Sequence, residues 1–128
     1  MSINNVAVAE GVMQIPKWWS CPPGYEKLQE QAHLLGKNEL LERSFIADQE
    51  GRFPRESLKA LAEAGFSAVT IPAAEGGLGA GYMGFAVLAE SFAQYCPSTT
   101  MCWVMHTAAV HSLYEEGTPE LRNRYIPK

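Results

Sequence analysis

The pattern of apolar and polar positions predicts helices along almost the whole chain. From residue 25 to about residue 48 the residues are good helix formers, and apolar side chains recur on two sides of the helix. One side carries Tyr25, Leu28, Ala32, Leu35 and Ile46, and the other carries Leu34, Leu41 and Phe45. A helix that is apolar on two sides is usually packed between partners, and Gly36 is the weak point of this one.

A short helix is predicted within the stretch RFPRESLKALAEAGF. Pro54 suits the first helical position, and Gly65 suits a left-handed residue that ends the helix. The buried stripe of this helix is predicted to be Leu58, Leu61 and Ala62. Residues 67–71 are predicted to be extended, because Pro72 disfavours a helical conformation at the residue before it.

Two longer helices and a short one follow. Residues 82–96 give an amphipathic pattern, with apolar positions at Tyr82, Phe85, Ala86, Ala89, Phe92, Ala93 and Cys96. Ser98 or Thr99 is expected to cap the next helix. That helix, residues 100–115, is apolar on nearly every side, which is typical of a helix enclosed by other parts of a protein. The last helix begins at Thr118, a cap followed by a proline.

These elements predict an all-α fold, a helical bundle of four to five helices. The bundle is expected at residues 25–128 and an N-terminal arm at residues 1–24. The apolar residues of the arm do not recur at the regular spacing of a helix or a strand. Trp18 and Trp19 would anchor it by burial, or it forms a partly ordered tail.

Composition excludes several classes of protein. The 128 residues carry a net charge of −4 and are 47% hydrophobic, as expected for one globular core. Aromatic residues do not alternate with Lys and Arg, so nucleic-acid binding has no support. No window approaches the roughly 18 apolar residues of a membrane span, and the N-terminus lacks the pattern of a secretory signal. Three cysteines without a CxxC pair favour free thiols and a cytoplasmic location.

Three glycines match a nucleotide-binding motif by letter alone. Gly79, Gly81 and Gly84 give GxGxxG, but no strand directly precedes them and no acidic residue follows about 20 positions on. The pattern therefore indicates a loop that needs positive φ angles or a close approach of another segment.

No metal site or catalytic constellation is predicted from the remaining polar residues. Cys102 and His106 lie one helical turn apart, but two ligands do not make a zinc site. A buried thiol and a hydrogen-bonded core histidine are expected instead. Glu90 is expected to be a solvated surface acid.

The order of turn and cap residues resembles a known family. The informative stretches are RFP at residues 52–54, IPAAEGGLG at residues 71–79, STT at residues 98–100 and GTPELRNRYIP at residues 117–127. From about residue 28 to the last residue, this order is similar to the N-terminal helical domain of the acyl-CoA dehydrogenase family. The resemblance implies α,β-desaturation of an acyl thioester by an FAD-dependent enzyme.

The resemblance also implies that most of such an enzyme lies outside this sequence. In the family a β-barrel and a C-terminal helical domain follow, FAD lies between them, and the catalytic glutamate belongs to the C-terminal domain. No catalytic residue is therefore expected in this chain, which alone should be inactive and bind no FAD. The implied partners are acyl-CoA or another acyl thioester, the missing domains or a partner chain, and further copies in a homo-oligomer.

The implied acyl pocket falls on the apolar central helix. By the resemblance, its first turns line the pocket at Thr100, Met101, Val104 and Ala108, which share one helical face. Core packing explains each of these residues equally well. Alone, this helix should leave an apolar patch of several hundred Å² exposed or cause self-association.

Two alternatives remain open at this point. The same domain occurs in related flavin monooxygenases and nitroalkane-oxidase-like enzymes, which use different chemistry. In the second alternative, the chain is a stand-alone helical interaction module that is derived from the family and catalyses no reaction.

Overall fold

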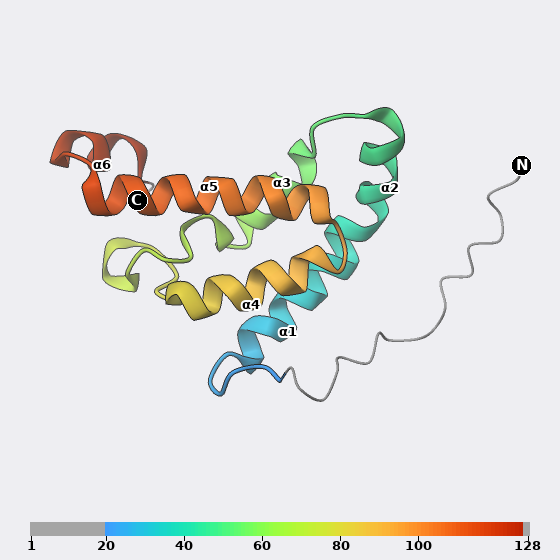
Figure 1. Ribbon diagram of the computed structural model, residues 1–128, viewed down its shortest axis with the longest axis horizontal. Helices are drawn as coiled ribbons and strands as arrows, with labels where there is room; N and C mark the ends of the chain where they lie inside the picture. Colours follow the sequence, from blue (N-terminus) through green and yellow to red (C-terminus); the bar gives the residue numbers. More distant parts are fainter. Residues whose placement is uncertain (1–19, 127–128) are drawn as a thin grey trace, which may run out of the picture.

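The computed structural model describes residues 20–126, and within them the chain is helical and without a β-strand. The elements in order are α1 (Glu26–Leu35), the π-helical segment η1 (Gly36–Leu40), α2 (Leu41–Glu50), α3 (Arg55–Glu63), the 3₁₀ turns η2 (Phe66–Ala68) and η3 (Ala73–Glu75), α4 (Gly81–Ala93), α5 (Pro97–Glu116) and α6 (Pro119–Tyr125) (Figure 1). The predicted all-α fold is confirmed. The interpretation of Trp18 and Trp19 as anchors of an arm concerns residues outside the described range.

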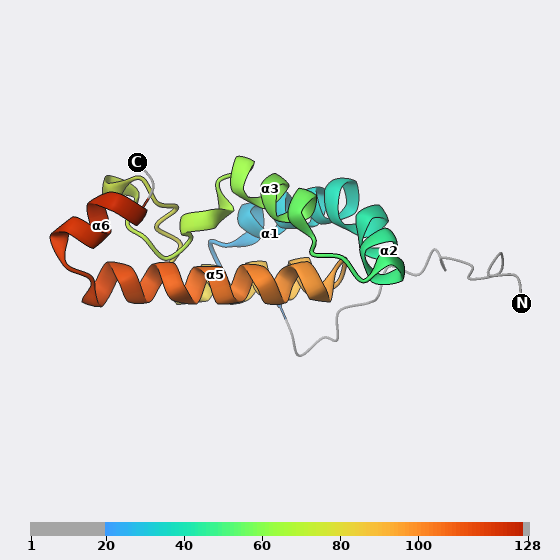
Figure 2. The same cartoon turned by 90° about the horizontal axis from the view of Figure 1, so that it is seen from above.

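The helices form two layers. In Figures 1 and 2, α4 and α5 run side by side in opposite directions, and α1, α2 and α3 lie on one face of this pair. Helix α1 packs on α4, α3 packs on α5, and η2 lies between α3 and α5. Because α1, η1 and α2 form one continuous helical run, the described residues contain five separate rods, the upper end of the predicted range.

The core is built around Trp103 of α5. This side chain is 2% exposed, and its indole N–H donates to the carbonyl of Phe66 at 2.7 Å. Its ring stacks on Phe85 and meets Phe92 edge to face, both at 5.3 Å between centroids. One residue therefore joins α5 to α4 and to the η2 turn, and buried aromatic contacts of this kind contribute beyond the area that they bury.

The predicted weak point at Gly36 is confirmed. The α-helical run changes to a π-helical segment at this residue, as π-bulges do inside longer helices. The ring of Tyr95 lies against Gly36 so closely that a Cβ atom there would overlap it, and the Tyr95 hydroxyl is 3.2 Å from His33 Nδ1. The absence of a side chain at Gly36 thus allows the end of α4 to pack against the bulge.

Only one of the two apolar sides predicted for the first helical run is covered within residues 20–126. Ala32 and Leu40 are buried in the core. On the other side Leu34 and Phe45 are each 62% exposed, and Leu41 is exposed as well. Ile46 was predicted on the same side as Ala32 but is exposed, so the prediction was wrong at this residue. The described part of the chain therefore supplies a partner for one side of this run and leaves the other to solvent.

Residues 67–69 are not extended, so the prediction of an extended segment was wrong for this part of it. After the left-handed Gly65, residues 66–68 form a 3₁₀ turn, and Val69 is also helical in conformation. The glycine loop returns to this segment: the N–H groups of Leu78 and Ala80 donate to the carbonyls of residues 68 and 69. These bonds satisfy the backbone without a strand, which local sequence alone does not reveal.

The buried face of α4 also differs from the prediction. Tyr82 is 69% exposed, and Ala86 and Ala93 are exposed as well. The side of the helix that is buried carries Gly84, Val87, Leu88, Ser91 and Phe92. Helix α4 is apolar on most sides, so its pattern does not select one face; Gly84 does, because it lets α1 approach closely.

In α3 the predicted stripe is correct at Leu61 but wrong at Ala62, which is exposed. Leu58 is half-buried and packs against the core. Ser57 is buried in place of Ala62.

The predicted ends of the helices are mostly confirmed. Gly65 is left-handed, with φ 85°, and the Thr118 hydroxyl accepts the N–H of Leu121 as a cap of α6. Helix α3 begins one residue after Pro54. The cap of α5 is neither Ser98 nor Thr99 but the Cys96 thiol, which accepts the N–H of Thr99 at 3.4 Å.

The interpretation of the glycine motif as a loop is confirmed at Gly79 but not at Gly84, which lies inside α4, whose first residue is Gly81. Gly79 and Gly81 both have positive φ angles, 66° and 61°. At Gly77 the carbonyl of Ile71 lies where a Cβ atom would stand. The loop therefore needs glycine for backbone conformation and close approach, as expected from its sequence.

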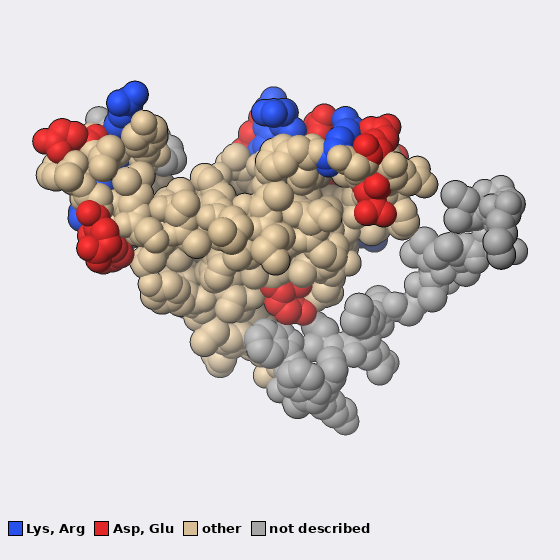
Figure 3. All heavy atoms as spheres, turned by 45° about the horizontal axis from the view of Figure 1, so that its top comes forward, with Lys and Arg blue, Asp and Glu red and all other residues tan. Residues whose placement is uncertain are grey.

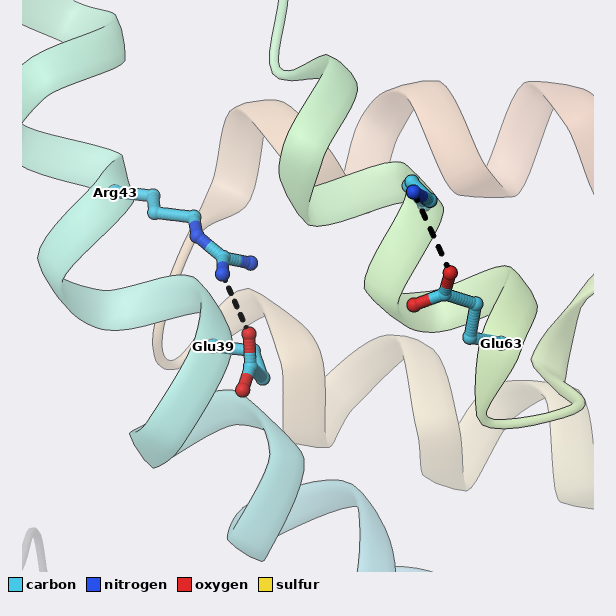
Figure 4. A network of polar contacts seen from close by, with 4 residues as sticks. Glu39, Arg43 and Glu63 are labelled. Atoms are coloured by element: carbon cyan, nitrogen blue, oxygen red, sulfur yellow. Dashed lines mark ion pairs between the residues drawn. The ribbon is translucent and has the colours of Figure 1, made fainter.

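Charged side chains gather at the two ends of the molecule. Exposed pairs join Arg43 to Glu39 at 2.7 Å and Lys59 to Glu63 at 3.6 Å (Figure 4). Figure 3 shows acidic and basic residues over α2 and α3 and around α6, with a broad uncharged surface between them. Such exposed pairs contribute little to stability, so their effect is mainly on solubility.

The contact between Gly36 and Tyr95 yields a first prediction. Substitution Gly36→Ala should lower the free energy of unfolding by about 1–3 kcal/mol, because the added methyl group overpacks against the Tyr95 ring. Urea denaturation followed by circular dichroism measures the change. The exposed neighbour gives the control, Lys37→Ala, which should change stability by less than about 0.5 kcal/mol. Most of the cost of Gly36→Ala should vanish in a Tyr95→Ala background; an undiminished cost would contradict the assigned contact.

Candidate functional site

Helix α5 is buried on one side and uncovered on the other. Thr99, Trp103 and Thr107 are buried, whereas Met101 and Met105 are each 62% exposed. Ala108 and Ala109 are also exposed, and no Asp, Glu, Lys or Arg occurs in α5 before Glu115. The expected uncovered apolar side of this helix is confirmed. Figure 3 shows an uncharged surface between the two charged ends of the molecule.

The four predicted pocket residues share one sector of α5 but differ in exposure. Thr100 is 6% exposed, and its hydroxyl donates to the Cys96 carbonyl at 2.9 Å. Val104 is half-buried against the core, and Met101 and Ala108 face outward. Met101 lines a larger cavity and Ala108 a smaller one. The structure therefore does not bring all four into one cavity, and their contact with an acyl chain stays a prediction.

The larger cavity, about 610 Å³, lies between α3 and α5. Its walls are formed by Phe53, Leu58, Lys59, Ala62, Ser67, Met101, Cys102, Trp103, Met105 and His106. Most of these side chains are apolar, and cavities of this size hold small organic ligands. The cavity therefore offers apolar contacts to a hydrocarbon group and few side chains that could bind a charged group.

His106 was predicted to be a core histidine, and that prediction was wrong. The residue is exposed, with Nε2 at 3.2 Å from the carbonyl of Ser67, and Cys102 is only half-buried. The buried Trp103 fixes the rotation of α5 about its axis. This rotation places Cys102 and His106 at the edge of the helix face that is turned toward α3. Among residues 20–126 no three His, Cys, Asp or Glu side chains lie together in a way that could hold a metal ion.

The smaller cavity, about 190 Å³, lies between α4 and α5. It is lined by Thr70, Tyr82, Phe85, Thr107, Ala108, His111 and Ser112. The Tyr82 hydroxyl is hydrogen-bonded to His111 Nε2, and the two rings meet edge to face at 5.0 Å. Sequence reasoning missed Thr70 and His111 as cavity residues. The only available signal was that His111 follows Ala108 by about one helical turn.

Two carboxylates near these helices have specific partners. Glu75 accepts a hydrogen bond from the Tyr114 hydroxyl at 2.7 Å, which raises the pKa of Tyr114 and ties the end of α5 to η3. Glu90 was predicted to be a solvated surface acid, but it is half-buried. Gln94 donates a hydrogen bond to one of its oxygens. Burial, followed by the charges of Glu26 and Glu90, raises the pKa of the Cys21 thiol. None of these groups lines either cavity.

With this geometry in view, the chain can be compared with known proteins. Residues 22–128 match the family described as "Acyl-CoA dehydrogenase, N-terminal domain", so the chain belongs to that family. The match begins somewhat earlier than the resemblance noted in the sequence, which starts at about residue 28. No helix of residues 20–126 is long and apolar enough to cross a membrane.

Several curated proteins are similar to this chain. Acryloyl-CoA reductase (NADH) of Anaerotignum propionicum is 29% identical over 103 residues, which is 80% of this chain and 26% of that protein. Probable acyl-CoA dehydrogenase FadE25 of Mycobacterium tuberculosis is 27% identical over 106 residues, 83% of this chain and 27% of that protein. Cyclohex-1-ene-1-carbonyl-CoA dehydrogenase of Geobacter metallireducens is 28% identical over 92 residues, 72% and 24% respectively. The chain thus spans about a quarter of the length of the curated relatives it matches.

The uncovered side of α5 yields a second prediction. The chain should bind a hydrophobic fluorescent dye and self-associate, and the double substitution Met101→Lys with Met105→Lys should reduce both, because it places charge on the exposed apolar side. Dye fluorescence and sedimentation velocity measure the two effects. Gln49→Lys with Asn123→Lys is the matched control, since it adds the same two charges at exposed polar positions. An equal reduction by the control would show that α5 is not the adhesive surface.

Proposed function

We propose that this chain forms the N-terminal helical part of an FAD-dependent acyl-CoA dehydrogenase that desaturates an acyl thioester between Cα and Cβ. Its membership of the family supports this, as do relatives whose names refer to acyl-CoA compounds. The observation that carries the proposal is the uncharged, uncovered side of α5, which a hydrocarbon chain and other domains would cover.

In this proposal one wall of the acyl pocket is the sector of α5 that carries the exposed Met101 and Ala108, the half-buried Val104 and the buried Thr100. Val104 and Ala108 are small and leave room for a chain, and Met101 supplies a flexible thioether that adapts to its shape. The Thr100 hydroxyl is already bonded to the Cys96 carbonyl, so its methyl group is what remains for an apolar neighbour. A wall of this kind keeps water away from the reacting bond.

FAD itself does not fit the two cavities described above. The diphosphate of a dinucleotide needs positive charge or a helix N-terminus with free N–H groups. In the larger cavity the one basic chain, Lys59, has a side chain 73% exposed and pairs with Glu63. We therefore place FAD and the catalytic base in a β-barrel and a C-terminal helical domain, in a longer enzyme or a partner chain.

The remaining parts of the proposal concern assembly and location. An uncovered apolar side on α5 and another on the α1–α2 run favour a homo-oligomer in which copies and further domains cover them. Cys21, Cys96 and Cys102 are all free thiols, which favours a cytoplasmic enzyme.

A chimaeric enzyme tests the proposed function. Residues 22–126 replace the matching segment of the M. tuberculosis relative, and oxidation of acyl-CoA is followed with an electron-accepting dye. The chimaera should be active. Met101→Glu should lower its kcat/KM at least about 100-fold, because a carboxylate would be buried against hydrocarbon without a partner.

Leu34→Glu is the control for this substitution, since both parent residues are 62% exposed in the isolated chain. Both variants should leave the unfolding midpoint of the isolated chain nearly unchanged. A chimaera that folds, retains FAD and does not oxidise acyl-CoA would overturn the proposed function. Full activity of Met101→Glu would remove α5 from the acyl pocket.

The isolated chain should form no stoichiometric complex with FAD, because neither of the two cavities described above has groups for the diphosphate. Equilibrium dialysis against FAD, with flavin fluorescence as the readout, measures binding. A tight one-to-one complex would place the flavin site within these residues and contradict the assignment to other domains.

A further inference from the structure

The continuous run of α1, η1 and α2 carries two rows of exposed side chains on its outer side (Figure 1). Ala32, Gly36 and Leu40 are buried and recur at every fourth residue, so they mark the side that is turned to the core. The first row follows these residues by two positions and contains Leu34, Asn38 and Glu42. The second row begins one residue after Gly36, keeps the same spacing and contains Lys37, Leu41 and Phe45. All six side chains are exposed.

The two rows complement each other when one of them is read backwards. In an antiparallel contact across a two-fold axis, residues that share a midpoint along the chain lie opposite each other. Leu34 and Phe45 have their midpoint between residues 39 and 40, and Lys37 and Glu42 have the same midpoint. The first row of one copy would therefore lie along the second row of another copy, with an apolar contact at one end and opposite charges at the other.

Both ends of this contact are open to a partner in the described part of the chain. Leu34 and Phe45 are each 62% exposed, and Leu34 also lines a cavity of about 340 Å³ beside the η2 turn. An aromatic side chain that fills a hollow of its partner often carries much of the binding energy of an interface. Within residues 20–126 neither Lys37 nor Glu42 has an ion-pair partner, so each can meet an opposite charge from another chain.

We propose that the two rows bind a second copy of this chain in an antiparallel, two-fold symmetric dimer. In this dimer Phe45 of each copy packs on Leu34 of the other, and Lys37 of each copy pairs with Glu42 of the other. The inference rests on the homo-oligomer of the proposed function and names its surface and geometry. A surface needs to complement itself only if its partner carries the same surface, which favours a second copy over a different domain. A contact between two helical runs is small beside that of a permanent dimer, so this dimer is weak.

Sedimentation equilibrium of the 128-residue chain measures the dimer. The parent for all variants carries Met101→Lys with Met105→Lys, which suppresses association through the exposed side of α5. This parent should show an equilibrium between monomer and dimer. Phe45→Ala should weaken the dimer at least about 10-fold, because the aromatic contact is lost at two symmetric places. Circular dichroism checks that each variant keeps its helices.

Charge exchange tests which residues lie opposite each other. Lys37→Glu and Glu42→Lys, each alone, place like charges opposite each other twice, so each should weaken the dimer at least about 5-fold at low ionic strength. An equimolar mixture of the two variants should form a heterodimer about as tight as the parent dimer, because every charge then faces an opposite one. Arg124→Glu is the control, since it makes the same change of charge as Lys37→Glu at an exposed position on α6. It should change the dimer by less than about 2-fold.

Each outcome decides the inference. A parent that stays monomeric up to about 1 mM would overturn it. A mixture that binds no more tightly than either single variant would also overturn it, as would an equal loss on Arg124→Glu. Recovery in the mixture supports it, because only contact between these two positions on different copies produces that result.

The measurement is independent of any reaction. An active chimaera together with a monomeric parent chain would refute this inference alone. A dimer that shows the expected charge exchange, together with a folded, FAD-bound but inactive chimaera, would refute the proposed function alone.

Discussion

The burial of Trp103 fixes the orientation on which both cavities depend. Its indole N–H is bonded to the Phe66 carbonyl, and its ring is held between Phe85 and Phe92 of α4. Rotation of α5 about its axis would expose the ring and leave a buried carbonyl unpaired, both of which are costly. The helix therefore presents one definite row of side chains to solvent, one to α3 and one to α4.

The three rows of α5 differ in chemistry. The row toward α3 carries Cys102 and His106, and it closes the larger cavity. The row toward α4 carries Thr107 and His111, and it closes the smaller one. Between them, Met101 and its neighbours form the uncovered apolar side. A helix that is apolar nearly all round in sequence thus divides into surfaces with separate functions once a single aromatic residue is fixed.

The sequence predicted those features that depend on neighbouring residues in the chain. The Thr118 cap, the proline that follows it at the start of α6 and the left-handed Gly65 act locally, and the structure shows them as predicted. The start of α5 differs from the prediction, because the helix begins at Pro97 with Cys96 as its cap. The buried face of α4 depends on where α1 approaches, at Gly84, and no local pattern contains that information. Residues 67–69 were mistaken for an extended segment because their hydrogen-bond partners come from the later glycine loop.

In the candidate site, too, only the features that depend on neighbouring residues in the chain could be predicted. Helical spacing placed Met101 and Ala108 in one sector of α5, and the uncovered side of the helix could be foreseen from its composition. The cavity between α4 and α5 could not, because it needs Thr70 after the η2 turn, the rotation set by Trp103 and the ring of Tyr82 together.

The side chains of α5 change from apolar to polar toward the C-terminal end of the helix. From Met101 to Ala108 the side chains at the surface of α5 are thioether and aliphatic groups, and one turn later, on the side toward α4, lies His111. Because Trp103 fixes the rotation and the helix fixes the rise, the distance from the apolar start to the polar end is set by the backbone and not by flexible side chains.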